Sequence, residues 1–509
     1  MYLVWDGSIL AANLAGAALE IFMFTAVTAI LYQVAAVLSQ WKPLVGNGAS
    51  KPGGKLISDW IIIMIGWFPV LLAYYPGIFA YDASNQVMQV MSGSYSTHHP
   101  LLHTLLLGCF FKWGNNLGSN NTGILLYSIV QMAILAWAMA WAVDYMKKRG
   151  MGRGTYIILM AFYIFFPVNS MLAISTTKDV LFSAFCLIVM IFLMKVTDTP
   201  ELWRQKGLVL AGSVALAGMM LFRNNALYAC ILFCPLFFFC LKRYWKNYLG
   251  WVGISLILTG VISLSMGMIL RPENGSVVEL LSVPLQQMAR VGYYHGDELD
   301  SAVKEELYHF IPENVVERYA PNISDGVKNF VDGTSIKEES FRFLRIYVKL
   351  GLNWPREYLN AFACLTQGFW YIEDTSHAHI YGVGMESRLG YMLTNYKSMP
   401  EGYEVTHVSY FPQLEYLLEK LFSDNKYLKA PILSVLFAPA FWEWMLVGYT
   451  VIVLYKRRYD MLIPVLFLIG YQLTLLLGPV CLIRYVYPVV ICVPILLIKV
   501  WQSLKGDKH

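Results

Sequence analysis

The sequence has 509 residues, of which 57% are hydrophobic and 14% are charged, and its mean hydropathy is +0.52. Soluble globular chains are roughly 45–50% apolar and about 25% charged, so this composition excludes a soluble, disordered or collagen-like protein. The net charge of +5 is divided unevenly, because residues 271–430 hold 22 acidic and 15 basic residues and so carry −7, while the remainder carries +12. This division indicates a basic membrane part with an acidic insert, and no feature indicates a nucleic-acid partner.

Eleven apolar segments follow one another along the chain, and each is near the ~20 residues that a helix needs to cross a bilayer. They predict an all-α polytopic membrane protein with about 11 transmembrane helices. The predicted organisation is a transmembrane region at 1–270 with a first outer loop at 76–120, a mainly helical extracytoplasmic loop domain at 271–430, and C-terminal transmembrane helices at 431–509. The apolar segments are 9–39, 57–75, 121–146, 155–173, 179–196, 206–222, 226–241, 248–270, 431–455, 460–478 and 480–500.

Basic residues predict the orientation of these helices, because short cytoplasmic loops are enriched in Lys and Arg. Basic clusters follow every odd-numbered helix, as in KKRGMGR at 147–153 and KRR at 456–458. The N-terminal MYLVWDGS contains no Lys or Arg, so it lacks the basic start of a cleaved signal peptide. We therefore predict a multi-pass cell-membrane protein with its N-terminus outside and its C-terminus in the cytoplasm. Residues 76–120 and 271–430 then face outward.

Two outward segments are apolar but do not fit as spans. HPLLHTLLLGCFFKW at 99–113 is too short to cross a bilayer, and residues 341–371 mix aromatic residues with Arg and Lys. Both compositions are typical of amphipathic helices that lie on a membrane surface. We expect both to be outer interfacial helices.

The first outer loop contains one carboxylate, Asp82, in the sequence YYPGIFAYDASNQ. Asn85 and Gln86 follow it closely, and His98 and His99 come later in the same loop. A single acid among polar side chains at a membrane boundary is suited to act as a general base on an acceptor hydroxyl, with these neighbours contacting the substrate. The alternative is a structural one, in which Asp82 caps a helix that runs through ASNQVMQVM.

Three cations are predicted at the outer ends of other helices. Lys178 and Asp179 begin the fifth predicted helix, Arg223 ends the sixth, and Arg484 begins the eleventh. Lys is unfavourable at a helix N-terminus, and cations at the membrane rim often mark a ligand or ion path. Arg and Lys together are the usual ligands of phosphate, so these cations predict a phosphate-binding site. Snorkelling of each long side chain to the membrane surface is the structural alternative.

These motifs resemble the GT-C superfamily of polytopic glycosyltransferases. The resemblance rests on Asp82 at the start of the first outer loop, the interfacial HHPLLHTLLLGCFF, a second acid in TTKD, and RYVYP near the C-terminus. The chain looks closest to a bacterial, largely Gram-positive family of multi-pass proteins whose function is not known. Three stretches carry that likeness, namely TKDVLFSAF at 177–185, SVPLQQMARV at 282–291 and RYAPNISDGVK at 318–328.

The resemblance implies an inverting glycosyltransferase that moves a sugar from a polyprenyl-phosphate donor to a cell-envelope glycan or lipid acceptor on the outer face of the membrane. It implies Asp82 as the base, and Asp179 as a catalytic residue that assists or helps to hold a divalent cation such as Mg or Mn. Lys178, Arg223 and Arg484 would receive the leaving phosphate. The first loop lacks the paired acids of the protein O-mannosyltransferases, so the resemblance leaves metal use open.

Two other functions remain open from the sequence. A polysaccharide polymerase or ligase of similar architecture would use arginine and histidine without a carboxylate base. A transporter or flippase of a lipid-linked intermediate would place polar residues deep in both halves of the bundle, whereas here they cluster at the outer rim.

Overall fold

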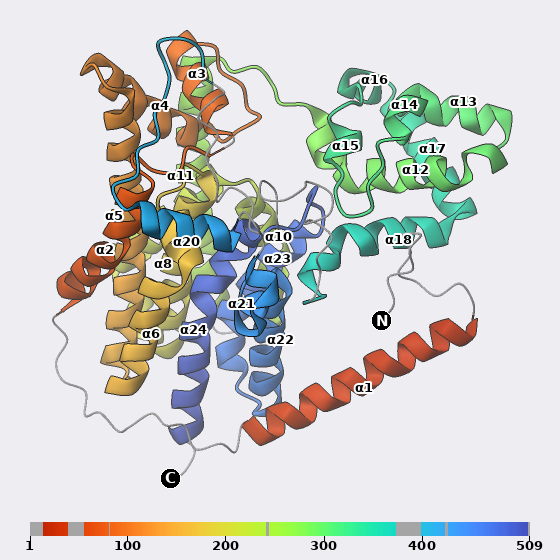
Figure 1. Ribbon diagram of the computed structural model, residues 1–509. Helices are drawn as coiled ribbons and strands as arrows, with labels where there is room; N and C mark the ends of the chain where they lie inside the picture. The colour runs from red at the N-terminus through yellow and green to blue at the C-terminus, as the bar shows by residue number, and fades with distance from the viewer. Residues whose placement is uncertain are drawn as a thin grey trace.

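The computed structural model describes residues 14–38, 55–80, 82–240, 244–372, 399–422 and 426–506. Within these ranges the regular structure is helical, and extended backbone pairs only as isolated bridges. Five of the described helices are long and apolar enough to cross a membrane: α2 (Leu56–Ala73), α5 (Asn120–Lys148), α8 (Lys178–Asp198), α11 (Trp245–Leu270) and α24 (Ile483–Gly506). The protein is therefore all-helical, with the features of a multi-pass membrane protein (Figure 1).

The remaining apolar segments are also helical. The first segment forms α1 (Leu14–Leu38), and others form α9 (Lys206–Phe222), α10 (Asn225–Cys240), α22 (Pro439–Tyr455) and α23 (Leu462–Leu475). The last four have 14 to 17 residues, fewer than the ~20 of a straight span. The described residues thus contain five candidate spans, or six if the bent pair α6 and α7 counts as one.

Two segments predicted as single helices are broken by proline. The 155–173 segment forms α6 (Arg153–Phe165) and α7 (Pro167–Ala173), whose axes differ by 51°. The 431–455 segment forms α21 (Pro431–Leu436) and α22 (Pro439–Tyr455). Proline lacks an N–H and disfavours helical geometry in the preceding residue, so each helix ends before the proline and a new one begins with it. The prediction of one continuous helix was wrong at both places.

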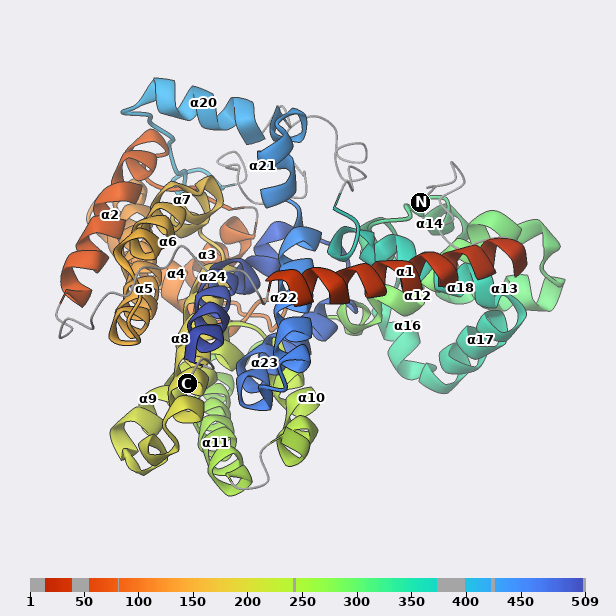
Figure 2. The ribbon, with the colours of Figure 1, turned by 90° about the horizontal axis from the view of Figure 1, so that it is seen from below.

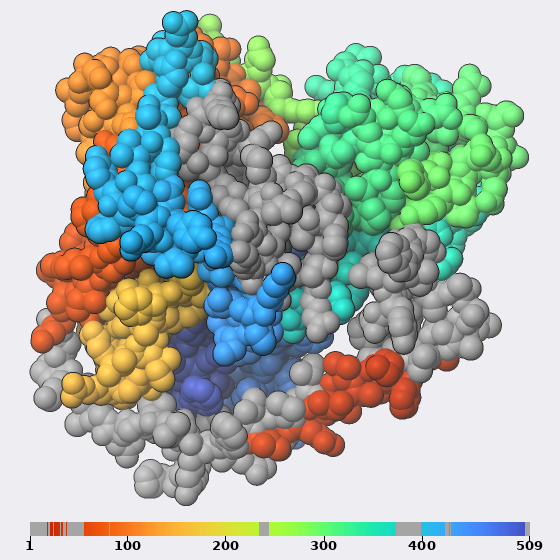
Figure 3. Space-filling model, viewed as in Figure 1, coloured from red at the N-terminus to blue at the C-terminus, as the bar shows by residue number. Residues whose placement is uncertain are grey.

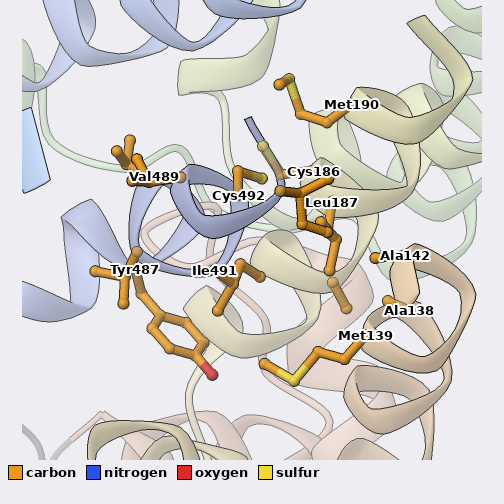
Figure 4. Close-up of a cluster of buried hydrophobic side chains, with 14 of the residues drawn as sticks. Ala138, Met139, Ala142, Cys186, Leu187, Met190, Tyr487, Val489, Ile491 and Cys492 are labelled. Atoms are coloured by element: carbon orange, nitrogen blue, oxygen red, sulfur yellow. The ribbon is translucent and has the colours of Figure 1, made fainter. Parts of the chain in front are cut away.

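Helices α8 and α24 form the centre of the bundle. Almost every side chain of α8 between Asp179 and Val196 is buried, and the middle of α24 is equally enclosed. Figure 4 shows how α5, α8 and α24 meet, with Met139, Leu187 and Ile491 packed together beside Cys186 and Cys492. By contrast, α11 exposes most of its apolar side chains, as a helix on the outside of a membrane bundle does.

One end of the bundle, which we call the site end, is where α5, α8 and α24 begin. The first outer loop there contains α3 (Ala83–Ser92) and α4 (Leu101–Asn116), so the helix predicted at 99–113 is confirmed. A second group of helices stands beside this loop at the same end (Figures 1 and 3). Its members are α12 (Ser282–His295), α13 (Ser301–Phe310), α14 (Glu313–Val316), α15 (Asp325–Lys328), α16 (Gly333–Glu338), α17 (Ser340–Asn353) and α18 (Pro355–Thr366).

The segment predicted as one loop domain, 271–430, forms two separate parts of the structure. Residues 278–358 share one apolar core, with Leu285, Leu307 and Ile346 fully buried in it. Residues 399–422, which include α20 (Pro412–Phe422), lie against the start of α5 and the end of α2. The Asn121 side chain bonds to the backbone of Thr406, and Val408 pairs with Tyr75.

The opposite end, which we call the basic end, is where α5, α8 and α24 finish. Lys147 at the end of α5 pairs with Asp59 at the start of α2 at 2.6 Å. Asp198 at the end of α8 pairs with Arg149 and, at 2.9 Å, with Lys499. Three basic residues, Lys147, Arg149 and Lys499, therefore lie at the end opposite the predicted site residues. The outward orientation of the site end remains a prediction.

Candidate functional site

Two short loops hold the central residues of the site end in place. Residue Ile78, ahead of α3, pairs with the turn ahead of α8, because its N–H donates to the Ile174 carbonyl and its own carbonyl accepts from the Thr176 N–H, both at 2.9 Å. The Thr176 hydroxyl also accepts from the Ala80 N–H at 2.8 Å. This pairing fixes the backbone on both sides of the site, so that Asp82 and Lys178 face each other.

A glycine permits this close approach. Gly77 has a φ of 131°, and a Cβ there would lie 2.2 Å from the hydroxyl of Ser128 in α5. Any other residue would have to displace α5 and adopt an unfavourable backbone conformation. The first loop can therefore lie directly on the bundle.

Asp82 lies at the N-cap position of α3, but its carboxylate makes no capping hydrogen bond. Its Oδ2 is instead 3.8 Å from Nζ of Lys178, which also lies 3.3 Å from Nδ1 of His99. The side chains of Asp82 and Lys178 are 26% and 19% exposed, so the pair remains accessible. The helix predicted from ASNQVMQVM is present, while the contact of Asp82 differs from that of a cap.

His99 is neutral at physiological pH. Burial, reinforced by the charge of Lys178, lowers the pKa of His99 to about 3. Its Nδ1 therefore accepts a hydrogen bond from the Lys178 ammonium, and no charge repulsion arises between them. His98 is exposed beside it, with the two rings 4.5 Å apart.

Asp179 binds two arginines. Its Oδ1 accepts from Arg223 at 2.6 Å and its Oδ2 accepts from Arg484 at 3.1 Å, while the Thr177 hydroxyl donates to Oδ2 at 3.1 Å. The Asp179 side chain is only 1% exposed. Both carboxylate oxygens are thus engaged by cations of the chain, which makes Asp179 an anchor for the arginines.

Tyr485 completes this cluster. The two guanidinium groups lie over its ring, at 4.7 Å for Arg223 and 4.6 Å for Arg484, and Arg484 also donates to its hydroxyl at 2.9 Å. A planar guanidinium stacked on an aromatic ring retains N–H donors at its edge. Tyr485 lies within the motif RYVYP, but its contact with the two arginines was not predicted from the sequence.

A buried chain of polar side chains supports the first loop from below. His103 Nδ1 lies 3.1 Å from the amide oxygen of Gln86, and its Nε2 lies 2.8 Å from the Tyr127 hydroxyl. Tyr127 in turn donates to Gln131 at 2.8 Å. Gln131 Nε2 donates to the carbonyls of Ala173 and Ser175. These carbonyls lie at the C-terminal end of α7 and just after it, where carbonyls have no partner within the helix.

The Tyr127 hydroxyl donates to the oxygen of Gln131, and the NH₂ group of Gln131 donates to the two carbonyls. Burial lowers the pKa of His103 to about 3, so the ring is neutral and one of its nitrogens donates while the other accepts.

The predicted substrate ligands therefore lie in different surroundings. Gln86 is 1% exposed and takes part in the buried chain, where its side chain also bonds to Thr104. Asn85 accepts from Gln89 within α3. Lys178, Asp179, Arg223 and Arg484 come together as one cluster with Asp82 and His99 beside it. Among the described residues, no group of three or more His, Cys, Asp and Glu side chains forms a metal-ligand set.

The second group of helices touches the turn at 479–480, which precedes Arg484 in the first turn of α24. The N–H of Ser324 donates to the Pro479 carbonyl at 2.9 Å, and Ile323 pairs with Val480. The nearby Asn322 is 5% exposed, and neither its amide oxygen nor its nitrogen has a hydrogen-bond partner. RYAPNISDGVK at 318–328 carries a family likeness. Its contact with the turn at 479–480 was not predicted, because nothing local in the sequence links residues so far apart.

Comparison with known proteins gives one result. No curated protein and no solved structure matches the chain. Residues 91–509 match a protein family described as "Family of unknown function (DUF6020)". The match includes Lys178, Asp179, Arg223 and Arg484, while Asp82 precedes it. Because the match extends over most of the sequence, the chain belongs to the DUF6020 family.

Proposed function

We propose that the protein is an inverting, GT-C-type glycosyltransferase that moves a sugar from a polyprenyl-phosphate donor to a cell-envelope glycan or lipid acceptor on the outer face of the membrane. The observation that carries the proposal is the arrangement of one accessible carboxylate, Asp82, beside a cluster of three cations at one end of the bundle. The resemblance of the loop motifs to GT-C enzymes supports the same reaction class.

Asp82 is the base in this proposal. The acceptor hydroxyl oxygen attacks the anomeric carbon of the sugar, the bond from that carbon to the phosphate oxygen breaks, and the hydroxyl proton passes to the Asp82 carboxylate. Lys178 at 3.8 Å favours the ionised carboxylate, the form that accepts a proton. Attack opposite the departing phosphate inverts the anomeric centre.

The cations receive the leaving group. Lys178, Arg223 and Arg484 carry three positive charges against the two negative charges of Asp82 and Asp179, so the cluster has a net charge of +1 before a donor binds. A phosphate leaving group needs little protonation but does need its charge neutralised, and preformed donors supply this electrostatically. Arginine additionally offers a planar fork that matches phosphate oxygens.

We assign Asp179 a positioning role. Its two oxygens hold the two guanidiniums in fixed places, so that the arginines are aligned before the donor arrives. This arrangement does not need Asp179 to touch the sugar. It also leaves a divalent cation, Mg or Mn, as an unassigned participant in the reaction.

The wider architecture is part of the proposal. In a bilayer α1 and the shorter helices α9, α10, α22 and α23 would join the five candidate spans and the bent pair α6–α7, giving the predicted eleven crossings with the N-terminus outside and the C-terminus in the cytoplasm. The site end would then face the compartment in which envelope glycans are assembled. The helices of residues 278–358 would stand over the acceptor.

The proposal is tested by comparing envelope glycans of cells that produce the wild-type chain, no chain, or the Asp82→Asn variant. We expect one sugar substituent to be lost equally in the last two. Purified protein in lipid nanodiscs should also release polyprenyl phosphate from one member of a panel of polyprenyl-phosphate sugars. Asp297→Asn, a fully exposed carboxylate of the insert, is the matched control. An unaltered glycan profile in both mutant cells contradicts the proposal, and lipid movement without sugar release favours a flippase.

A further inference from the structure

Helix α17 is apolar on two faces. One face is buried in the core of residues 278–358 through Phe343, Ile346 and Leu350. The opposite face points away from that core and carries a stripe at helical spacing that α18 continues. We call these exposed residues the α17–α18 stripe: Phe341 (81% exposed), Leu344 (53%), Val348 (48%), Leu352 (76%) and Leu359 (58%). Exposed apolar stripes of this extent mark contact with a partner or a membrane.

The charge around the stripe differs from that of its surroundings. Residues 271–430 carry −7, but residues 340–366, which form α17 and α18, contain four basic residues and one acidic residue. Arg345 and Lys349 are exposed next to the stripe, and Arg345 also pairs with Glu306 at 2.8 Å. An apolar face bordered by Arg and Lys is the composition of helices that lie on anionic lipid surfaces.

The position of the two helices fits such a surface. The chain passes from α18 to Trp370, whose carbonyl accepts a hydrogen bond at 2.9 Å from the indole of Trp444 in α22. This contact ties the end of α18 to the first turns of an apolar helix of the bundle. Figure 1 shows α18 lying across the direction of α5, α8 and α24, and Figure 2 shows α17 in view from the side of the bundle.

We propose that the α17–α18 stripe docks on the lipid surface next to the bundle and selects anionic headgroups. The apolar side chains enter the boundary between headgroups and acyl chains, to a depth of about 5–10 Å, and the neighbouring bases bind lipid phosphates. The α17–α18 stripe thereby holds the insert at the membrane, in addition to the contact of the insert with the Pro479 turn. This inference does not depend on the proposed sugar transfer.

The test uses the full chain in nanodiscs of phosphatidylcholine or of phosphatidylglycerol. An environment-sensitive fluorescent amino acid replaces Leu352 in one protein and Leu280 in another. Leu280 is the matched control, because it is 68% exposed on the same insert but lies outside α17 and α18. Quenching is measured with aqueous iodide and with lipids that carry a nitroxide near the headgroup.

We expect the probe at 352 to be quenched by the lipid nitroxide and protected from iodide, most strongly in phosphatidylglycerol, while the probe at 280 shows the reverse. Lys349→Glu should weaken lipid quenching at 352 in phosphatidylglycerol and leave the melting temperature unchanged. Equal iodide quenching at both positions would overturn the proposal. Protection of 352 from both quenchers would also overturn it, because a protein surface would then cover the stripe. Equal lipid quenching in both lipids would overturn the selection of anionic headgroups.

Discussion

The two ends of the bundle use charged residues in different ways. At the basic end, Asp59 is bound by Lys147 at 2.6 Å and by the Tyr156 hydroxyl at 2.9 Å, and Asp198 is bound by two cations and a tyrosine. These closed contacts join the ends of separate helices. At the site end, Asp82 and Lys178 stand 3.8 Å apart and are partly exposed. Carboxylates that are enclosed by short hydrogen bonds hold neighbouring helix ends together. A carboxylate that is partly exposed and 3.8 Å from its cation can instead reach a substrate.

By this comparison the two acids of the site end differ. Asp179 resembles Asp198, because each is bound by two cations of the chain. Asp82 lies farther from its cation, at 3.8 Å, than Asp59 does from Lys147 (2.6 Å) or Asp198 from Lys499 (2.9 Å). The comparison therefore separates a base from an anchor, and the substitutions below test that separation.

Asp82→Asn should have the largest effect. Asparagine keeps the shape but cannot take the proton, and general base catalysis typically contributes about 10²- to 10⁴-fold, so transfer should fall by that factor. The Asp82 side chain makes no capping hydrogen bond, and its 3.8 Å contact with Lys178 is partly exposed, so the melting temperature should change little. The measurement is polyprenyl-phosphate release together with thermal unfolding in detergent. Wild-type transfer by a stably folded variant would remove Asp82 from the mechanism.

Asp179→Asn should mainly reduce stability. The substitution leaves two nearly buried guanidiniums without a counter-charge, and breaking a buried ion pair in this way costs about 3–5 kcal/mol of the free energy of unfolding. Denaturant unfolding of the purified protein measures this loss. Asp198→Asn at the basic end is the control, and we expect a loss of similar size. A stable but inactive Asp179→Asn protein would instead place this carboxylate at the reacting atoms.

Arg223→Lys and Arg484→Lys should each weaken donor use while retaining charge. The lost guanidinium hydrogen bond to a charged group is worth about 1.5–3 kcal/mol, or roughly a 10- to 150-fold higher KM for the donor. Arg223→Ala and Arg484→Ala should do more. Donor titration in nanodiscs measures the KM, and acceptor KM is the internal control. An unchanged donor KM in all four variants would make these residues membrane anchors.

A further prediction concerns pH. His99 and His103 have pKa values near 3 in the folded protein and about 6.5 when unfolded, so the unfolded chain binds protons first as the pH falls. The free energy of unfolding should therefore fall below pH ~6.5, by about 1.4 kcal/mol per pH unit for each histidine. Unfolding midpoints at pH 7 and pH 5 measure this slope.

His103→Asn should reduce the dependence of the free energy of unfolding on pH by the contribution of one histidine, about 1.4 kcal/mol per pH unit. The charged groups that act on the two rings are Lys178, Asp82, Asp179 and Arg484. Asp82→Asn offers a check, because removing a negative charge should further disfavour protonation of His99. A pH profile identical in the wild type and in His103→Asn would mean that His103 has the same pKa in the folded protein as in the unfolded chain.

Much of this fold could be predicted from hydropathy alone. Long apolar runs such as 121–146 and 179–196 became α5 and α8 within a few residues, because bilayer thickness fixes helix length. The breaks at Pro167 and Pro439 were missed, since hydropathy averages over a proline. The clustering of Lys178, Arg223 and Arg484 was also predicted, because the alternation of basic loops assigns each helix end to a face.

The contacts within the site could not be predicted. That both arginines bind Asp179 depends on how α8, α9 and α24 pack, which no local pattern encodes. The buried chain through His103 and Tyr127 was missed as well. Gln131 was the residue from which this chain could have been predicted, because a glutamine in an apolar span must find hydrogen-bond partners. The carbonyls at the C-terminal end of α7 supply them.

The contact between residues 323–324 and the turn at 479–480 limits how the insert can be studied in isolation. A fragment cut out at residues 271–372 would lose the partner of the Ser324 N–H and expose Ile323, which packs against Val480 and Leu482 in the full chain. The cut would also separate the α17–α18 stripe from the lipid on which we propose that it docks. The fragment would then have two apolar surfaces in contact with water. Crystals or binding data obtained from it would therefore report self-association as readily as the behaviour of the whole protein.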